Sequence, residues 1–262
     1  MPENSIITLL SDFGLSDVYV GVMKGAIAQI NPALHAIDLT HQIPPQNIAA
    51  GRFCLMNAYP YFPYGTVHIA VVDPGVGSNR RAIAIQLSGG YLVGPDNGLF
   101  GGVLSDSPAV AAVELTNPSY WLPSTTSSTF HGRDIFAPVG AYLASGVPLE
   151  QLGRAIDPTT LVKLSIPECT KTNAGVVGCI QYIDRFGNLI TNIPGSEIEG
   201  KTWSVAVAEL FIRGSQTYSD SELGGFVALI GSHGWVEIAI NSGNAQSQLQ
   251  LEWGAKVELR YD

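Results

Sequence analysis

The first part of the chain alternates between short apolar runs and longer stretches with helical periodicity. Residues 6–11, IITLLS, form a continuous apolar run, which is typical of a strand buried on both faces. Residues 16–31 then carry apolar positions with the period of a helix. For this helix we predict Ser16 as the N-cap and Pro32 as the stop.

The same alternation continues to about residue 146. It predicts strands at 34–40, 66–73 and 109–116, a hairpin over 82–94, and helices at 46–59, 97–106 and 132–146. Pro138 is tolerated only early in a helix, so the last helix should begin near His131. This order of elements predicts an α/β domain, residues 1–165, in which helices flank a largely parallel sheet.

The pattern changes between residues 158 and 172. Short runs with period-two alternation follow, at 175–184, 187–193, 203–214, 224–232, 235–243 and 256–262. No helix of useful length is predicted among them. We therefore expect a second, all-β domain over residues 170–262, with a barrel-like or sandwich architecture.

Composition narrows the class of protein. Of the 262 residues, 46% are hydrophobic and only 13% are charged, with a net charge of −9. The 13 Lys and Arg residues form no basic run, which argues against nucleic acid or an anionic membrane as a partner. Three cysteines without CxxC spacing, and an N-terminus without a signal-peptide pattern, favour a soluble cytoplasmic protein.

Aspartates follow three of the predicted strands. Asp12 follows the first, Asp73 lies in "DPGVG" after the third, and Asp96 lies in "PDNG" after the hairpin. In open α/β sheets, ligands bind beyond the carboxyl ends of the strands, although a single aspartate there is more often a turn former or a helix cap. Several aspartates on one edge favour a binding site.

Phosphate is a poor ligand for this acidic edge. The chain has neither GxGxxG after its first strand nor GxxxxGK[ST], and Pro74 removes one backbone donor from the glycine-rich loop. A cationic or neutral ligand with hydroxyl groups, such as a nucleoside without phosphates, fits better. A catalytic metal is not predicted, because no HxH or HExxH spacing accompanies the aspartates.

The segment "STFHGRDIFAP", residues 128–138, places three ionisable side chains at a predicted helix start. Asp134 is explained by the positive end of the helix and Arg133 by pairing with a carboxylate. For His131 we favour a functional role. In the second domain, Asp184 and Asn188 lie in "YIDRFGNLITNI", where they either bind a ligand or stabilise a hairpin turn.

Six stretches together resemble one family, the S-adenosyl-L-methionine hydroxide adenosyltransferases, which are related to fluorinating and chlorinating enzymes. They are "SDFGLSDVYVGVMKG", "VVDPGVGSNRR", "GPDNGLF", "STFHGRDIFAP", "YIDRFGNLITNI" and "LIGSHGWVEIAINSGNA", in order along nearly the whole chain. The resemblance implies an N-terminal α/β domain and a C-terminal barrel-like domain. It also implies a homotrimer, with each site between the domains of neighbouring subunits.

The resemblance also implies site residues. The family's catalytic trio falls on Asp73, Arg80 and His131, with Arg81 as the alternative arginine. Gly132 stands where the fluoride pocket of the relatives has a serine, which disfavours fluoride as the nucleophile.

For the substrate, the resemblance assigns the ribose hydroxyls to Asp12, with Phe13 beside it. The remaining substrate-binding candidates are Asp184 and Ser232 for the methionine portion, Asn188 for adenine and Tyr218 for stacking on the base. His233 departs from an arginine of the fluorinating relative.

The implied reaction is hydrolysis of S-adenosyl-L-methionine to adenosine and L-methionine, without a cofactor. Water would attack C5′ in line, and the sulfonium would leave as a neutral thioether. Three alternatives stay open: a halide adenosyltransferase of the same fold, a protein that only binds S-adenosyl-L-methionine or adenosine, and a metal-dependent hydrolase.

Overall fold

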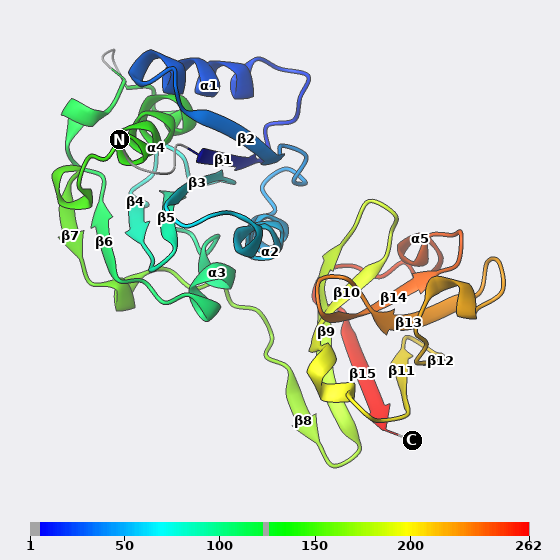
Figure 1. Ribbon diagram of the computed structural model, residues 1–262. Coiled ribbons are helices and arrows are strands. Elements are labelled where there is room, and N and C mark those ends of the chain that lie inside the picture. The colour runs from blue at the N-terminus through cyan, green and yellow to red at the C-terminus, as the bar shows by residue number, and fades with distance from the viewer. Residues whose placement is uncertain (1–5, 123–125, 262) are drawn as a thin grey trace. The chain divides into compact units, whose positions relative to one another are not determined.

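The computed structural model describes residues 6–122 and 126–261, and the chain forms two compact units, Met1–Leu164 and Ser165–Asp262 (Figure 1). The first combines a sheet with helices, and the second is a sheet in which all paired strands are antiparallel apart from one isolated parallel bridge. The predicted classes, α/β followed by all-β and barrel-like, are confirmed. Each unit is described separately below.

The first unit contains a seven-stranded mixed sheet with the order β2-β1-β3-β5-β4-β6-β7. Its strands are β1 (Ile6–Ser11), β2 (His35–Thr40), β3 (Thr66–Val71), β4 (Ala82–Gln86), β5 (Gly90–Pro95), β6 (Ala111–Glu114) and β7 (Arg154–Ile156). Strands β2, β1, β3 and β5 are parallel, whereas β4, β6 and β7 pair antiparallel. The β4–β5 hairpin causes the change, because a short turn reverses the chain.

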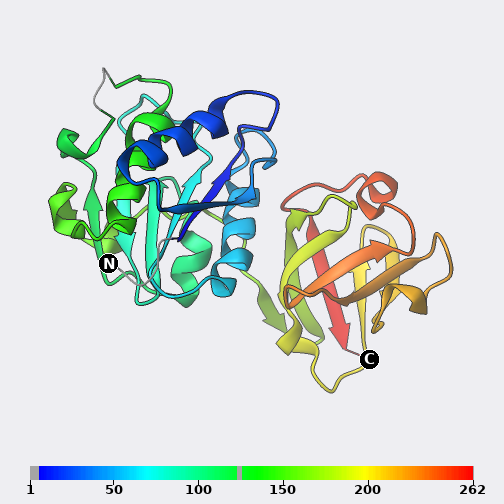
Figure 2. The ribbon, with the colours of Figure 1, turned by 45° about the horizontal axis from the view of Figure 1, so that its top comes forward.

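Helices cover both faces of this sheet (Figures 1 and 2). They are α1 (Tyr19–Ile30), α2 (Ile48–Ala58), α3 (Gly101–Asp106) and α4 (Ala137–Ala144). Helices α1 and α4 pack together on one face, where Gly140 brings α4 against Ile69. Helix α2 packs with α3, and Gly51 of α2 lies over Leu10 and Val72. Because both faces are covered, β3 is buried along its whole length and β1 is buried from Ile7 onward, as the sequence predicts for β1. Both strands also carry buried polar side chains, among them Thr8 and His68.

The predicted N-cap of the first helix is wrong. Helix α1 begins at Tyr19, and its N-cap residue, Val18, makes no side-chain capping bond. The chain leaves β1 through Gly14, whose φ is +70° and whose N–H donates to the carbonyl of His41 at 2.7 Å. This connection carries Ser16 to the surface, so the helix starts only at Tyr19, next to Val20, the first residue of its buried face.

The last helix of this unit starts where the sequence predicts, immediately after His131, but its first turn is a π-helix over Gly132–Phe136. Pro138 follows at the second position of α4. It has no N–H to donate, so the carbonyl of Asp134 accepts instead from the N–H of Leu122 at 2.9 Å. The proline thereby leaves an acceptor that fixes the segment preceding the helix.

The second unit is one eight-stranded sheet with the order β12-β11-β15-β9-β10-β14-β13, and β8 pairs with β9 outside this path. Its elements are β8 (Thr170–Thr172), β9 (Gly175–Ile183), β10 (Leu189–Pro194), β11 (Trp203–Val207), β12 (Leu210–Arg213), β13 (Phe226–Ile230), β14 (Trp235–Ile240), α5 (Ala245–Leu249) and β15 (Lys256–Tyr261). A bridge between Gly214 and Ala228 joins the two end strands, so the sheet nearly closes on itself. Closure shortens the exposed sheet edges.

One predicted strand of the second unit is in fact two. The run 203–214 folds back on itself as the β11–β12 hairpin, which turns at Ala208 with φ of +51°. A non-glycine residue in this conformation gives no turn signal in the sequence, so the run reads as one long strand. Helix α5 has only five residues, in agreement with the prediction of no longer helix.

Candidate active site

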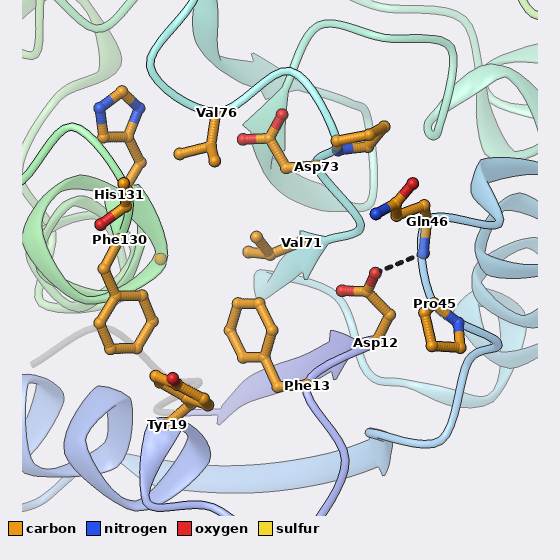
Figure 3. A pocket seen from close by; sticks show the side chains of 13 residues that line it. Asp12, Phe13, Tyr19, Pro45, Gln46, Val71, Asp73, Val76, Phe130 and His131 are labelled. Atoms are coloured by element: carbon orange, nitrogen blue, oxygen red, sulfur yellow. Dashed lines mark hydrogen bonds between the residues drawn. The ribbon is translucent and has the colours of Figure 1, made fainter.

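A cavity of about 420 Å³ lies at the carboxyl ends of β1 and β3 (Figure 3). This volume is in the range of small-molecule sites, roughly 300 to 1,000 Å³. The lining residues are Asp12, Phe13, Tyr19, Pro45, Gln46, Val71, Asp73, Pro74, Val76, Thr129, Phe130, His131 and Gly132. Asp12, Phe13, Asp73 and His131 are therefore brought together as the sequence predicts.

Arg80 connects the two ionisable residues at one side of this cavity. Its Nε lies 3.0 Å from both carboxylate oxygens of Asp73, and a terminal nitrogen donates to Asp73 Oδ2 at 2.6 Å. The same terminal nitrogen lies 2.7 Å from Nδ1 of His131. The face of the guanidinium lies 5.4 Å from the ring centroid of the buried Phe136. Arg80 is thus fixed at its edge by hydrogen bonds and on its face by an aromatic ring.

Arg81, the alternative arginine, contacts neither Asp73 nor His131 in any bond recorded for it. Its Nε donates to Asp96 at 2.8 Å, and its other nitrogens donate to Thr160. Asp96 also accepts from the N–H of Val162 at 2.8 Å. Asp96 and Arg81 hold residues 160–162 against the end of β5, and neither lines the cavity. Of the three strand-end aspartates, two face the cavity and one is structural.

The contact with Arg80 decides which nitrogen of His131 carries the proton. A guanidinium has only donors, so Nδ1 of His131 must accept, and the proton of the neutral ring lies on Nε2. Burial first, and then the neighbouring Arg80 charge, lower the pKa of His131 below its usual value. The ring is therefore neutral at neutral pH, with an acceptor toward Arg80 and a donor on its other side.

The loop that carries Asp73 and Arg80 meets the segment before His131 at Gly77. This residue has φ of +77°, and a Cβ on it would lie 2.5 Å from the carbonyl oxygen of Ser128. Only glycine combines this backbone conformation with such a close approach. On the other side of the loop, Ser78 accepts from the N–H of Arg80 at 3.2 Å. These contacts set the loop that follows β3 against the segment that precedes His131.

Asp12 is held by the backbone rather than by a cation. Its Oδ2 accepts from the N–H of Gln46 at 2.7 Å. Gln46 has φ of +64°, an uncommon conformation for a non-glycine residue, and it lines the cavity beside Asp12 (Figure 3). The second carboxylate oxygen of Asp12 is left for a ligand. Sequence reasoning missed Gln46, because a left-handed glutamine carries no pattern.

Three aromatic rings form one wall of the cavity. The Phe130 ring lies 5.7 Å from that of Phe13 and 5.2 Å from that of Tyr19, both in edge-to-face geometry. A Cβ on Gly132 would lie 3.3 Å from Phe130 and 3.4 Å from Phe13. Phe130 and Tyr19 were not predicted as site residues. The available signal was an aromatic residue close to a predicted site motif: Tyr19 follows "SDFG", and Phe130 begins "FHGRD".

Arg133 and Asp134 have the structural roles predicted for them. Arg133 Nε donates to Asp134 Oδ1 at 2.6 Å, and the fully buried Asp134 also accepts from the N–H of Ser127 at 2.8 Å. The carboxylate ties the incoming chain to the helix start. Neither residue lines the cavity.

In the second unit, Asp184 and Asn188 build the turn between β9 and β10. Asp184 Oδ1 accepts from the N–H groups of Phe186 and Asn188, and Oδ2 accepts from the Asn188 side chain, all within 2.9 Å. The hairpin-turn alternative is therefore observed. It does not remove a ligand role, because each carboxylate oxygen has a further lone pair.

Glu237 of β14 is a buried carboxylate that the sequence did not predict as a site residue. It contacts both Tyr218 and His233. It accepts from the Tyr218 hydroxyl at 2.7 Å and lies 3.1 Å from Nε2 of His233. Nδ1 of His233 accepts from the N–H of Trp235 at 3.2 Å. Burial, then Glu237, and more weakly the charge of Asp184 raise the pKa of Tyr218. Ser232 lies in the same β13–β14 turn as His233.

Two further properties concern the described residues, 6–122 and 126–261. They contain no cluster of three or more His, Cys, Asp or Glu side chains arranged to hold a metal ion. None of their helices combines the length and the apolar character that a membrane crossing needs.

The fold and the cavity define a ligand-binding α/β protein with an appended barrel-like unit. Family models identify it further: the S-adenosyl-L-methionine (SAM) hydroxide adenosyltransferase N-terminal domain matches residues 7–153, and the C-terminal domain of the same family matches residues 178–258. Together these matches cover more than half of the chain, which therefore belongs to the SAM hydroxide adenosyltransferase family.

Individual relatives agree with this assignment. Two proteins named (R)-S-adenosyl-L-methionine hydrolase, from Salinispora arenicola and Salinispora tropica, are 40% and 41% identical to it. The alignments cover 99% of both chains in the first case and 97% in the second. A fluorinase from an Actinoplanes species is 30% identical over 76% of each chain. The crystal structure of an uncharacterized conserved protein from Thermotoga maritima is 34% identical, covers 97% of this chain and 99% of its own, and has a TM-score of 0.90.

The approach of Gly77 to Ser128 gives a first prediction. Gly77→Ala should cost at least about 2 kcal/mol of unfolding free energy, because strain at positive φ and a clash with a backbone oxygen add. Gly146→Ala is the matched control, since Gly146 has φ of +94° with nothing within 4 Å of its added Cβ. It should cost about 1 kcal/mol. Urea denaturation measures both, and equal losses would contradict the close approach.

Proposed function

We propose that this protein hydrolyses S-adenosyl-L-methionine to adenosine and L-methionine, by attack of water on C5′. The observation that carries the proposal is the Arg80 guanidinium bound to both Asp73 and His131, the two ionisable residues that line this side of the cavity. Membership of the SAM hydroxide adenosyltransferase family supports the substrate, as do the hydrolase names of relatives that match the full length.

The difficult requirement of this reaction is to activate the nucleophile, because water is a weak one. An oxygen of water forms a bond to C5′, the C5′–S bond breaks, and its electron pair passes to sulfur, which leaves as the neutral thioether of methionine. Because this leaving group needs no proton, no general acid is required. One proton from water must be accepted. The protein therefore has to orient one water molecule and take that proton.

We assign the proton to Asp73 rather than to His131. Nδ1 of His131 already accepts from Arg80, and the other ring nitrogen carries the proton of the neutral ring, so the imidazole has no free acceptor. Asp73 keeps free lone pairs beside its bonds to Arg80. In this assignment His131 donates from Nε2 to orient the water. Arg80 holds both groups and stabilises hydroxide character as it develops.

In this proposal the substrate is bound by the first unit of one subunit and the second unit of a neighbouring subunit. Asp12 binds the ribose hydroxyls through its remaining oxygen, with Phe13 packed beside the sugar. Asp184 and Ser232 bind the methionine portion. Asn188 binds adenine and Tyr218 stacks on it.

His233 is not assigned to the substrate carboxylate. Both of its ring nitrogens face groups of the protein, Glu237 and the N–H of Trp235. We assign it, with Glu237, to the support of Tyr218 and the Ser232 turn.

We further propose a homotrimer in which each site is completed by the neighbouring subunit. An exposed apolar patch at the start of α1 supports it: Leu15 is 64% exposed, Val18 72% and Val22 37%. Tyr19 belongs to this patch and also lines the cavity, so a subunit covering the patch would close the site.

Sedimentation velocity should give a single trimeric species at micromolar concentration; a monomer that turns over normally would overturn this arrangement.

We propose that the reaction needs neither a cofactor nor a metal ion, and that it takes place in the cytoplasm. The chemistry supports the first statement, because a sulfonium substrate is already activated. The second is supported by Cys54, Cys169 and Cys179, which are not joined in disulfides.

The proposed reaction is tested by the origin of the oxygen in the product. Purified protein with S-adenosyl-L-methionine, in oxygen-18 water with chelator and without chloride, should give adenosine labelled at the 5′ oxygen together with methionine. Mass spectrometry after chromatography measures the label. A halogenated nucleoside formed only on addition of halide would instead identify a halide adenosyltransferase. Bound but unchanged ligand would identify a binding protein.

The same assay separates the two arginines. Arg80→Lys should lower turnover by about 100-fold, because lysine cannot contact Asp73 and His131 in the same bidentate manner. Arg81→Lys is the matched control and should change turnover less than about threefold, since Arg81 bonds to Asp96 and Thr160 rather than to Asp73 and His131. Equal losses would contradict the assignment of the trio.

The role of His131 predicts a difference between two substitutions. His131→Ala should lower kcat/KM by about 100-fold, whereas His131→Asn should recover most of that loss, because its amide oxygen can accept from Arg80 in place of Nδ1. Activity of the wild type should fall only below pH 6.5, since the pKa of His131 is lowered and protonation would place N–H against Arg80. Equal losses in both variants, with an acid limb above pH 6.5, would make His131 the base.

A further inference from the structure

A second polar network lies behind the cavity, where β1 ends. The Ser11 hydroxyl lies 2.7 Å from Nδ1 of His41, and the two residues are only 1% and 3% exposed. Nε2 of His41 faces Asp38 Oδ1 at 3.1 Å, a close electrostatic contact rather than a well-directed hydrogen bond. Asp38 Oδ2 accepts from Lys24 Nζ at 2.6 Å. A chain of polar groups thus runs from the surface of α1 to the end of β1.

The direction of each donor in this chain follows from its chemistry. The N–H of Phe13 donates to Ser11 Oγ at 3.3 Å, so the serine hydrogen is free to point at Nδ1 of His41. The proton of the ring then lies on Nε2, toward the carboxylate of Asp38. Successive donors that point the same way strengthen one another.

This set of residues has the connectivity of a serine–histidine–aspartate triad, but it is not a nucleophilic site. Ser11 is buried and does not line the cavity. Its hydroxyl is held between a backbone N–H and an imidazole and is not exposed to a ligand in the cavity. The role of the network must therefore act through the residues it holds.

Those residues are the turn that enters the cavity. Besides Ser11 Oγ, the segment from His41 to Gln46 holds this turn at two more points. The carbonyl of His41 accepts from the N–H of Gly14 at 2.7 Å, and the N–H of Gln46 donates to Asp12 Oδ2 at 2.7 Å. The turn from Ser11 to Gly14 is thus fixed at its start, at its end and at the carboxylate between them.

We propose that Ser11 and His41, supported by the charge of Asp38, are positioning residues that set Asp12 and Phe13 for the ribose of the substrate. The inference rests on the proposed function, because that function makes the ribose the ligand of Asp12. It adds a buried device that neither touches the substrate nor takes part in the chemistry. Its expected signature is weaker binding with a nearly unchanged rate of the chemical step.

The chain offers a matched control on the same strand. Thr8 of β1 also presents a buried hydroxyl to a histidine, with Oγ1 2.8 Å from Nδ1 of His68, and both residues are at most 1% exposed. Because side chains alternate along a strand, Thr8 points to the opposite face of the sheet from Ser11. Removing either hydroxyl takes away one buried hydrogen bond to a histidine, so both substitutions should lower the free energy of unfolding in the same way. Only the Ser11 hydroxyl is connected to the cavity.

The experiment compares Ser11→Ala with Thr8→Ala in the full chain. Calorimetry gives the Kd of adenosine, steady-state kinetics give kcat and KM for S-adenosyl-L-methionine, and urea denaturation gives stability. We expect Ser11→Ala to raise the Kd and the KM about fivefold to tenfold while kcat changes less than twofold. Thr8→Ala should lose comparable stability and keep the wild-type Kd.

Asp38→Asn provides a second variant that folds without difficulty, since Asp38 is about one-third exposed. It removes the charge facing His41 and should raise the Kd of adenosine about twofold to threefold. If neither variant changes the Kd, or if Thr8→Ala changes it equally, the positioning role is wrong. Adenosine binding without turnover in the wild type would reject the proposed hydrolysis but not this inference. Failure of the wild type to bind adenosine would reject the inference.

Discussion

The arrangement of the site depends on a cation, the Arg80 guanidinium, that can donate hydrogen bonds but cannot accept them. The guanidinium of Arg80 lies between the carboxylate of Asp73 and the imidazole of His131, and its terminal nitrogen contacts both. Burying such a charge costs several kcal/mol unless it is paired and hydrogen-bonded. Asp73 provides the pairing charge, and the ring of Phe136 covers one face. With the cation fixed, the acceptor nitrogen of His131 and its neutral state follow from hydrogen-bonding rules alone.

The parallel strands explain why this cation lies beside a binding cavity. Strands β1 and β3 are neighbours that end at the same edge, and adjacent strands are about 4.8 Å apart. Asp12 and Asp73 therefore follow neighbouring strand ends, yet they are stabilised differently. Asp12 is held by a backbone N–H with one oxygen left over, whereas Asp73 is held by a charge. In the proposed reaction, Asp12 binds hydroxyl groups with its remaining oxygen, whereas Asp73 accepts the proton of a water molecule held beside Arg80.

Histidines in this protein are used as fixed hydrogen-bond acceptors. His131 accepts from Arg80, and His233 accepts from a backbone N–H. Burial lowers the pKa of His68 to about 4, so that its ring is neutral where it meets the hydroxyl of Thr8. His41 meets a serine hydroxyl in the same way. A neutral imidazole placed against a donor gives direction to a polar group without burying another charge.

The periodicity of apolar residues was enough to predict the two fold classes and most elements, because the buried faces of strands and helices produce a local pattern of apolar residues. The motifs determined that Asp12, Asp73 and His131 belong to one site. The resemblance favoured Arg80 over Arg81, but only the tertiary structure showed that Arg80 bonds to Asp73 and that Arg81 pairs with a structural Asp96. The physical reason is that neighbouring residues with the same chemistry differ only in the partners that distant segments bring to them. Hydrogen-bond direction and burial, which set each role, exist only once those segments have met.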